Sequence, residues 1–447
     1  MDTGQVIFRG ILALVILVLI FFSQRYWFRQ AWRLKQRVAH AGWRRLLRFM
    51  WAALLLAVVL PAVGWLLGLR GSSGKLFPLL GTWFFASLLG WLGIRAVKGA
   101  EFAWERIRHQ VLKQRHRNTP VGAQHAAAAA AEQNLAPVLT GADGLLNPAR
   151  RHFFRTATYF AGALPFIGAA YGFASERFRL TLERVEVPLA NLPVALDGLR
   201  IVQISDIHMS AYMTRAQVRR AVDMANDLGA DLAVVTGDFI TGRHDPLEEC
   251  VEEVARLRAP LGTWGCLGNH EIYAECEDEA TELLRKAGVR VLRRENAEII
   301  WQGQPFNLIG VDYQRTRGLD GRKLPMLAGV EPLVRRDVPN ILLSHNPNAF
   351  DRAAELGIEF TLAGHTHGGQ VNVEILESQI NAARFMTDYV AGLYSRPLTS
   401  RLPRVEARGR SPLATSFLYV NRGLGTVGAP VRVNAPPEIT LFTLRQV

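Results

Sequence analysis

Cysteine is scarce in this chain of 447 residues, which contains only Cys250, Cys266 and Cys276. Three cysteines cannot form a dense disulfide scaffold, and their spacing is not that of a zinc ribbon. They fit either one disulfide with a spare thiol or three buried free thiols. No repeat of fixed period is visible. The composition, 49% hydrophobic and 20% charged, excludes a disordered or collagen-like chain, and the length suggests two or three domains.

Acidic residues are nearly absent from the first third of the chain. Residues 1–152 hold 20 basic and 5 acidic residues, a net charge of +15, whereas residues 153–447 carry a net charge of −2. A total of +13 would ordinarily suggest nucleic-acid binding. Because the whole excess lies in the N-terminal third, we expect no nucleic-acid partner and interpret the excess as a signal of membrane topology.

The same third contains long runs without charge. Residues 49–69 and 76–94 are each long enough to cross a bilayer as a helix. Residues 6–22 form another candidate span, with Arg9 placed where its side chain can reach the interface. A signal peptide is the alternative for 6–22, but no small-residue cleavage site follows it. Residues 156–174 form a fourth candidate that is richer in Gly and Ala, and a buried or interfacial helix is the alternative there.

Basic loops indicate the orientation of these spans. Residues 24–48 carry eight basic residues and no acid, and residues 95–151 carry nine basic residues and four acids. The positive-inside rule places both loops in the cytoplasm. Four crossings then deliver residues 175–447 to the outside, whereas these residues are cytoplasmic if the fourth segment does not cross. Arg150-Arg151 resembles a twin-arginine export signal, although two arginines flanking a span are the plainer interpretation.

From about residue 178 the sequence pattern is typical of a soluble α/β protein. We expect a membrane domain with three transmembrane helices at 1–120, an Ala-rich cytoplasmic linker at 121–152, a fourth transmembrane helix at 153–177 and the α/β domain at 178–447. Short apolar runs alternate with helical spacing in that domain, which favours a layered α/β architecture. The predicted strands are 199–204, 231–236, 261–267, 306–311, 340–343 and 359–362, and the predicted helices are 214–228, 246–258, 277–287 and 347–356.

Polar side chains of a particular kind follow five of these strands. They are Asp206, His208, Asp238, Asn269, His270, His345, His365 and His367. Ligands of open α/β sheets bind beyond the carboxyl ends of strands, so we expect these side chains to converge. Carboxylate, amide and imidazole donors together suit Mn, Fe or Zn better than Ca or Mg.

In this order the motifs resemble the calcineurin-like metallophosphoesterase superfamily, over about residues 195–447. The sequence Gly-His-Thr-His-Gly-Gly-Gln at 364–370 and the tail at 421–426 and 436–439 are similar to its membrane-associated bacterial branch. The resemblance implies an α/β fold with a two-sheet β-sandwich flanked by helices, here preceded by about four transmembrane helices. The predicted spans and basic loops, in turn, lead us to expect a multi-pass protein of the bacterial inner membrane, with the catalytic domain on the extracytoplasmic side.

The resemblance further implies two divalent metal ions (Mn, Fe or Zn). One would be held by Asp206, His208 and His367, the other by Asn269, His345 and His365, with Asp238 bridging both. His270 would be the catalytic residue that stabilises the transition state or protonates the leaving oxygen. Glu271 would orient His270 or a neighbouring group, or would simply be a solvated acid at the start of a helix. Many relatives carry Asp or Asn where this chain has Thr241, which predicts altered support around the metals rather than an inactive site.

The expected function is hydrolysis of a phosphomonoester or phosphodiester by water that the metals activate. The membrane anchor suggests membrane lipids as partners and a lipid-linked or envelope substrate. Arg243 and His244 are weak candidates for substrate contacts, and a plain surface loop is the alternative. Two other functions stay open: a pyrophosphatase of the UDP-2,3-diacylglucosamine type at the cytoplasmic face, and a catalytically inactive membrane sensor.

Overall fold

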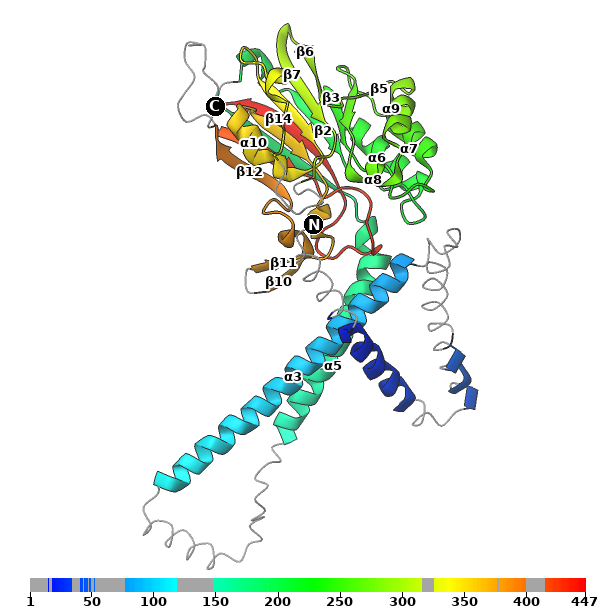
Figure 1. The fold of residues 1–447 in the computed structure, drawn as a ribbon, viewed down its shortest axis with the longest axis vertical. Helices are drawn as coiled ribbons and strands as arrows, with labels where there is room; N and C mark the ends of the chain where they lie inside the picture. Colours follow the sequence, from blue (N-terminus) through cyan, green and yellow to red (C-terminus); the bar gives the residue numbers. More distant parts are fainter. Residues whose placement is uncertain are drawn as a thin grey trace, which may run out of the picture. The chain divides into compact units, whose positions relative to one another are not determined.

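The computed structural model describes residues 77–118, 148–190, 192–315, 325–375, 378–398 and 415–447, with scattered residues between 15 and 52. The chain divides into two compact units. One is an α/β domain built mainly from residues 170–447. The other is a helical unit formed by the described parts of 10–71 and 80–169 (Figure 1).

The first sheet of the α/β domain has six strands. In spatial order they are β1 (Thr181–Leu189), β14 (Glu438–Gln446), β2 (Arg200–Ile204), β3 (Leu232–Thr236), β4 (Thr263–Cys266) and β5 (Val289–Val291). Strands β2 to β5 are parallel, whereas β14 runs antiparallel to β2 and parallel to β1. The C-terminal strand therefore lies inside the sheet, between two strands from the start of the domain.

The second sheet also has six strands. In spatial order they are β12 (Gly392–Pro397), β13 (Thr415–Val420), β9 (Phe360–Ala363), β8 (Asn340–Ser344), β7 (Gln304–Val311) and β6 (Glu295–Trp301). The four central strands are parallel, and an antiparallel strand closes each edge. A small hairpin of β10 (Val373–Ile375) and β11 (Ser378–Ile380) stands apart. The expected α/β fold with two sheets is confirmed, and both sheets are mixed.

Apolar side chains from both sheets form one core. Ile201 and Val234 of the first sheet belong to the same buried cluster as Leu308 and Ile341 of the second. Phe360 and Phe442 meet edge to face across this core, with ring centroids 5.2 Å apart. Burial of such faces is the main favourable contribution to folding, at roughly 25 cal/mol per Å². This core holds the two sheets in one fixed arrangement.

Helices cover the outer faces of the sheets (Figure 1). They are α6 (Arg215–Asn226), α7 (Leu247–Val254), α8 (Asn269–Ala274), α9 (Glu277–Lys286) and α10 (Phe350–Leu356). Short 3₁₀ turns are η1 (Glu176–Phe178), η2 (Val194–Leu196), η3 (Glu331–Leu333), η4 (Pro347–Ala349), η5 (His367–Gly369) and η6 (Ala382–Phe385).

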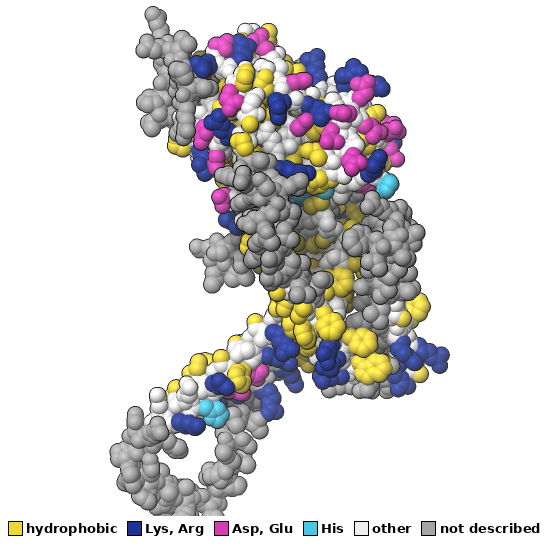
Figure 2. All heavy atoms as spheres, viewed as in Figure 1, with side chains coloured by type: hydrophobic (Ala, Val, Ile, Leu, Met, Phe, Trp, Pro, Cys, Tyr) yellow, Lys and Arg dark blue, Asp and Glu magenta, His cyan; other side chains and the backbone are white. Residues whose placement is uncertain are grey.

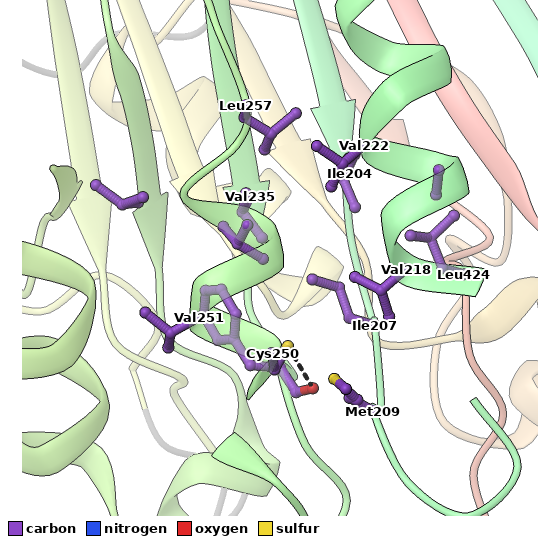
Figure 3. Packing of buried hydrophobic residues seen from close by; sticks show 14 of the residues in the cluster. Ile204, Ile207, Met209, Val218, Val222, Val235, Cys250, Val251, Leu257 and Leu424 are labelled. Carbon is purple, nitrogen blue, oxygen red and sulfur yellow. Dashed lines mark hydrogen bonds between the residues drawn. The ribbon is translucent and has the colours of Figure 1, made fainter. Parts of the chain in front are cut away.

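Helix α6 shows why these segments are helical. Its buried residues Val218, Ala221, Val222 and Ala225 recur at the spacing of one helical face. Figure 3 shows Val222 beside Ile204 of β2 and Val218 beside Ile207, all in one buried cluster.

The cysteines are three free thiols, all of them buried. Figure 3 shows the Sγ of Cys250 donating to the carbonyl of Phe239 at 3.3 Å. Of the two possibilities left by the sequence, three buried thiols is therefore the one observed.

The helical unit contains α3 (Phe77–Asn118) and most of α5 (Pro148–Ala174). Within the described residues, one helical stretch, Pro78–Val111, is long and apolar enough to cross a membrane. The described residues therefore contain one such helix instead of the expected bundle of about four transmembrane helices. Helix α5 contains the predicted span 156–174 but does not meet the same measure, since Gly, Thr and Pro165 lower its hydropathy.

The remaining predictions for the N-terminal third lie largely outside the described residues. This applies to almost all of the predicted spans 6–22 and 49–69, and to most of the predicted linker 121–152. The described surfaces of the two units differ in charge. In Figure 2, Asp and Glu are interspersed with Lys and Arg over the α/β domain, whereas Lys and Arg predominate on the helical unit.

Candidate metal centre

The predicted site residues follow the carboxyl ends of strands from both sheets. Asp206 and His208 come after β2, Asp238 after β3, and Asn269 and His270 after β4. His345 follows β8, and His365 and His367 follow β9 of the second sheet. Seven of the eight are placed together where these ends meet, as the parallel pairing of the strands favours, and Asn269 directly precedes His270 at the start of α8.

Three groups of side chains are close enough to share an ion, and one of them, His208, Asp238 and His270, overlaps the other two. The ligand atoms of Asp206, His208 and His367 lie within 4.8 Å of one another, and so do those of Asp238, His345 and His365. In the first group, His367 Nε2 is 3.3 Å from Asp206 Oδ1 and 3.1 Å from His208 Nε2.

Asp238 stands between the two groups. Its Oδ2 is 3.0 Å from His345 Nε2 and 3.4 Å from His208 Nε2. The other oxygen, Oδ1, accepts the backbone N–H of His270 at 2.9 Å. A carboxylate in this position can contact an ion on either side of it.

The chemistry of the donors fits divalent metal ions. Asn269 Oδ1 is buried, and among the described residues no donor reaches it. An unsatisfied buried oxygen costs about 1–3 kcal/mol, which contact with a cation would remove. Two imidazole nitrogens aimed at each other at 3.1 Å also need a cation or a proton between them. Which residues act as ligands stays a prediction from the sequence.

The backbone of the site is strained. Five of the seven predicted ligands have a positive φ, between 48° and 75°: Asp206, His208, Asp238, His365 and His367. Such conformations are rare outside glycine, cost of order 1–3 kcal/mol each and cluster at functional sites. Gly364 allows the chain before His365 to approach Asp206 closely, because a Cβ there would lie 2.1 Å from both Asp206 Oδ2 and Ser205 Oγ.

Neighbouring residues hold the imidazoles in place. Thr241 Oγ1 is 3.1 Å from His208 Nδ1, and the Thr241 carbonyl is 2.7 Å from His270 Nδ1. The carbonyl of Thr236 is 2.6 Å from His345 Nδ1. A proton on each Nδ1 would leave each Nε2 with a free lone pair facing the centre. Thr241 therefore supports two histidines at the position where the sequence predicted altered support.

Glu271 does not behave as a solvated acid. Its carboxylate is fully buried and accepts the backbone N–H groups of Asp238, Phe239 and Gly268 at 2.7–3.1 Å. Burial, reinforced by the nearby charge of Asp238, raises the pKa of Glu271 to about 7. The residue ties the turn after β3 to the turn after β4, so it orients the backbone of Asp238.

Burial and charge set the protonation of the histidines. Burial, with the charge of His345, lowers the pKa of His365 to about 3. Burial likewise lowers the pKa values of His367 and His270. At His345 burial also opposes the charged form, but Asp238 and Asp206 outweigh it and raise the pKa to about 10. Neutral imidazoles are the form that binds metal ions, so an ion bound at His345 would have to displace the proton that the two carboxylates favour there.

Arg243 and His244 lie on the exposed loop after β3. Arg243 pairs with Glu275 at 3.1 Å, and both side chains are more than two-thirds exposed. His244 is exposed as well. The structure describes no contact between either residue and the eight central side chains, so a role in substrate contact stays a prediction.

Two residues near the site were not found from the sequence. Arg432 is completely buried, donates to the carbonyls of Gly423 and Ala435, and places Nη2 3.5 Å from His367 Nδ1. Tyr313 follows β7, and its ring lies 5.3 Å from that of His365. Tyr313 could have been found from its place after an apolar strand. Arg432 could not, because a single buried arginine leaves no local sequence pattern.

The two-sheet fold and its Asp/Asn/His cluster define an α/β protein with a candidate dinuclear metal site. The family model for calcineurin-like phosphoesterases matches residues 199–369. An uncharacterized metallophosphoesterase of Aquifex aeolicus is 30% identical, over 60% of this chain and 94% of that protein. The chain therefore belongs to the calcineurin-like phosphoesterases, a family of hydrolases that act on phosphoric esters.

Two other relatives differ in what surrounds this domain. A protein of Bos taurus named transmembrane protein with metallophosphoesterase domain is 32% identical, over 58% of this chain and 56% of its own length. The chain thus spans little more than half of that relative. The UDP-2,3-diacylglucosamine pyrophosphatase LpxG of Chlamydia trachomatis is 26% identical, over 56% of this chain and 86% of that protein.

Proposed function

We propose that this chain is a membrane-anchored phosphoesterase that hydrolyses a phosphomonoester or phosphodiester with the help of two divalent metal ions. The observation that carries the proposal is the close approach of Asp206, Asp238 and the histidines, together with the buried Asn269 Oδ1, which no donor among the described residues reaches. Asp206, His208 and His367 would hold one ion and Asn269, His345 and His365 the other, with Asp238 between them. When bound, such ions neutralise phosphate oxygens and make water more acidic.

The chain's own groups position the reaction. Thr241 and Thr236 fix the imidazoles, and Glu271 fixes the backbone at Asp238. His270 is half-buried with its Nδ1 facing a carbonyl, so its Nε2 is the nitrogen available to substrate. Burial lowers the pKa of His270, but an arriving phosphate anion raises it again. We propose that Nε2 then gives its proton to the leaving oxygen as the phosphorus–oxygen bond breaks.

A lipid-linked substrate is the class we favour. The relative named UDP-2,3-diacylglucosamine pyrophosphatase has a name that specifies a substrate with acyl chains. In this chain two exposed apolar residues lie at the end of η6: Phe385 is 92% exposed and Met386 is 66% exposed. The segment bearing them begins at Asn381, which abuts Gly369 of the loop that carries His367. Exposed aromatic and thioether side chains of this kind can contact acyl chains.

Membrane attachment is supported by the stretch Pro78–Val111 and by the net charge of +15 in residues 1–152. We propose a multi-pass protein of the bacterial inner membrane. The side on which the α/β domain lies depends on α5. Four crossings put the domain on the extracytoplasmic face, and an uncrossed α5 keeps it in the cytoplasm, where a pyrophosphatase of the UDP-2,3-diacylglucosamine type would act. Protection of this domain from protease added to spheroplasts would overturn the extracytoplasmic placement.

The direct test is hydrolysis of p-nitrophenyl phosphate esters by the full chain purified in detergent. We expect activity that chelator removes and added Mn²⁺ restores, and no activity in Asp238→Ala. Asp278→Ala is the matched control, since Asp278 is an exposed acid on α9 whose partner is Arg293. Equal activity in wild type and Asp238→Ala would refute the proposal. Two bound metals without any hydrolysis would instead favour the inactive sensor.

A further inference from the structure

A second cluster of charge lies in the helical unit, at some distance along the chain from the phosphoesterase domain. There, helical residues 18–33 pack against α3 through buried polar contacts. Gln24 Nε2 donates to Ser87 Oγ at 2.7 Å, and Trp27 Nε1 donates to the Ser87 carbonyl at 2.8 Å. Ser87 is fully buried, so these bonds fix how the two helices are aligned along each other.

The same region is closed by α5. A Cβ at Gly90 of α3 would lie 2.7 Å from the carbonyl oxygen of Gly162, so the two helices approach closely at these glycines. Trp27 meets Phe166 of α5 edge to face, with centroids 5.2 Å apart. Three helical segments are therefore held together by small residues and by a half-buried aromatic pair. These contacts would fix the walls of a pocket between residues 18–33 and α3.

Such a pocket is present, with a volume of about 170 Å³. Four cations line it: Arg29 and Arg33 from residues 18–33, and Arg95 and Lys98 from α3. Its lining contains no acidic residue. Within the described part of the chain, none of the four cations forms an ion pair. Four like charges around one cavity repel each other, and an anion placed among them removes that cost.

The pocket lies where an apolar stretch ends. Residues 76–94 carry no charge, and Arg95 is the first charged residue after them. Buried Ile94 lines the pocket beside the cations, and the Arg95 guanidinium lies over the ring of Trp91, 5.5 Å from its centroid. In a membrane this is the level at which acyl chains give way to phosphates. A volume of 170 Å³ equals about six water molecules, which is room for a phosphodiester group.

We propose that this pocket binds the phosphodiester headgroup of an anionic glycerophospholipid, in the leaflet that faces the two basic loops. The inference rests on the membrane attachment proposed above, but not on the catalytic activity. Arginines suit the ligand because their planar forks bind phosphate oxygens two at a time. The bound lipid would hold together helices that belong to two separate parts of the sequence.

The test uses the full chain in detergent, with native mass spectrometry to count bound lipids as phosphatidylglycerol or phosphatidylcholine is added. Wild type should bind phosphatidylglycerol in preference. The double variant Arg29→Gln/Arg95→Gln should lose about 30-fold in affinity, as expected for two cations at an anionic surface. The matched control is Arg25→Gln/Arg106→Gln, which removes one charge from each of the same two helices at exposed positions outside the pocket. The control should change affinity by less than about threefold.

Three results would overturn the inference. They are equal loss of affinity in both double variants, no preference for phosphatidylglycerol in wild type, and displacement of the lipid by millimolar inorganic phosphate, which would make the pocket a site for free phosphate. Hydrolysis of p-nitrophenyl phosphate by the same preparations separates this test from the proposed function. Activity should be equal in wild type and both variants, and inactive protein that still selects phosphatidylglycerol would refute only the proposed enzyme.

Discussion

Thr241 offers the most specific test of how the metal centre is supported. Its Oγ1 lies 3.1 Å from His208 Nδ1, whereas its contact with His270 is made by the main-chain carbonyl. Thr241→Val keeps the β-branched shape and the carbonyl, and removes only the oxygen that faces His208. His208 can present the Nε2 lone pair to an ion only when Nδ1 carries the proton, which Thr241 Oγ1 accepts as a hydrogen bond.

The magnitude follows from that single bond. A neutral hydrogen bond contributes about 0.5–1.5 kcal/mol, which corresponds to about 2- to 12-fold in an equilibrium constant. Loss of a residue that orients a metal-bound histidine typically costs about 10- to 100-fold in metal affinity or activity. We therefore expect Thr241→Val to weaken metal binding about tenfold, where these two ranges meet. Activity at saturating metal should fall less than affinity does.

The assay is activity toward p-nitrophenyl phosphate as a function of free Mn²⁺, checked by calorimetric titration of the metal-free protein. Thr241→Ser is the control, since it keeps an oxygen in reach of His208 and should stay close to wild type. An unchanged metal titration in Thr241→Val would refute the reasoning. So would a Thr241→Ser variant as weak as Thr241→Val, because the loss could then not be assigned to the hydroxyl.

Three further predictions concern packing, pH and substrate. Gly364→Ala should abolish metal binding and lower the melting temperature, since the new Cβ would collide with the buried Asp206 carboxylate. Arg219, with Arg215, lowers the pKa of buried Glu253 to about 2, so its contribution to stability is complete above its unfolded pKa of about 4.3 and is lost as pH falls toward 2. The difference in melting temperature between wild type and Glu253→Gln should therefore shrink between pH 7 and pH 3, and a constant difference would contradict this. Replacing Phe385 and Met386 by Ser should reduce hydrolysis of an ester embedded in vesicles but not of a soluble ester, as both are exposed.

Strands near the site were predicted well because they are short apolar runs that end in turn residues. The runs 199–204 and 231–236 became β2 (Arg200–Ile204) and β3 (Leu232–Thr236). The C-terminal strand β14 was missed, although six of its nine residues are buried. Its position in the sheet depends on pairing with β1, and their partners lie more than 250 positions apart in the chain. Local periodicity carries no information about such pairing.

The candidate site was predictable for a related reason. Polar residues after apolar runs are visible in the sequence, and parallel strands bring their ends to one edge. The supporting contacts were not visible. Ser205 donates to Asp206 Oδ2 at 2.5 Å, and Arg432 reaches His367 from the far end of the domain. Nothing in the local sequence distinguishes these two residues from any other serine or arginine, because their roles depend on the folded geometry.

The strained backbone of the candidate metal centre explains why so many contacts surround it. Five residues with positive φ cost several kcal/mol together, which is comparable to the total stability of many domains. Such a backbone persists only if the surrounding structure leaves it no alternative. Glu271 on the turns after β3 and β4, and Gly364 against Asp206, supply that constraint. The strain is thus already present without an ion, so an ion that entered would find the predicted ligands oriented, and its binding free energy would not be spent on organising them.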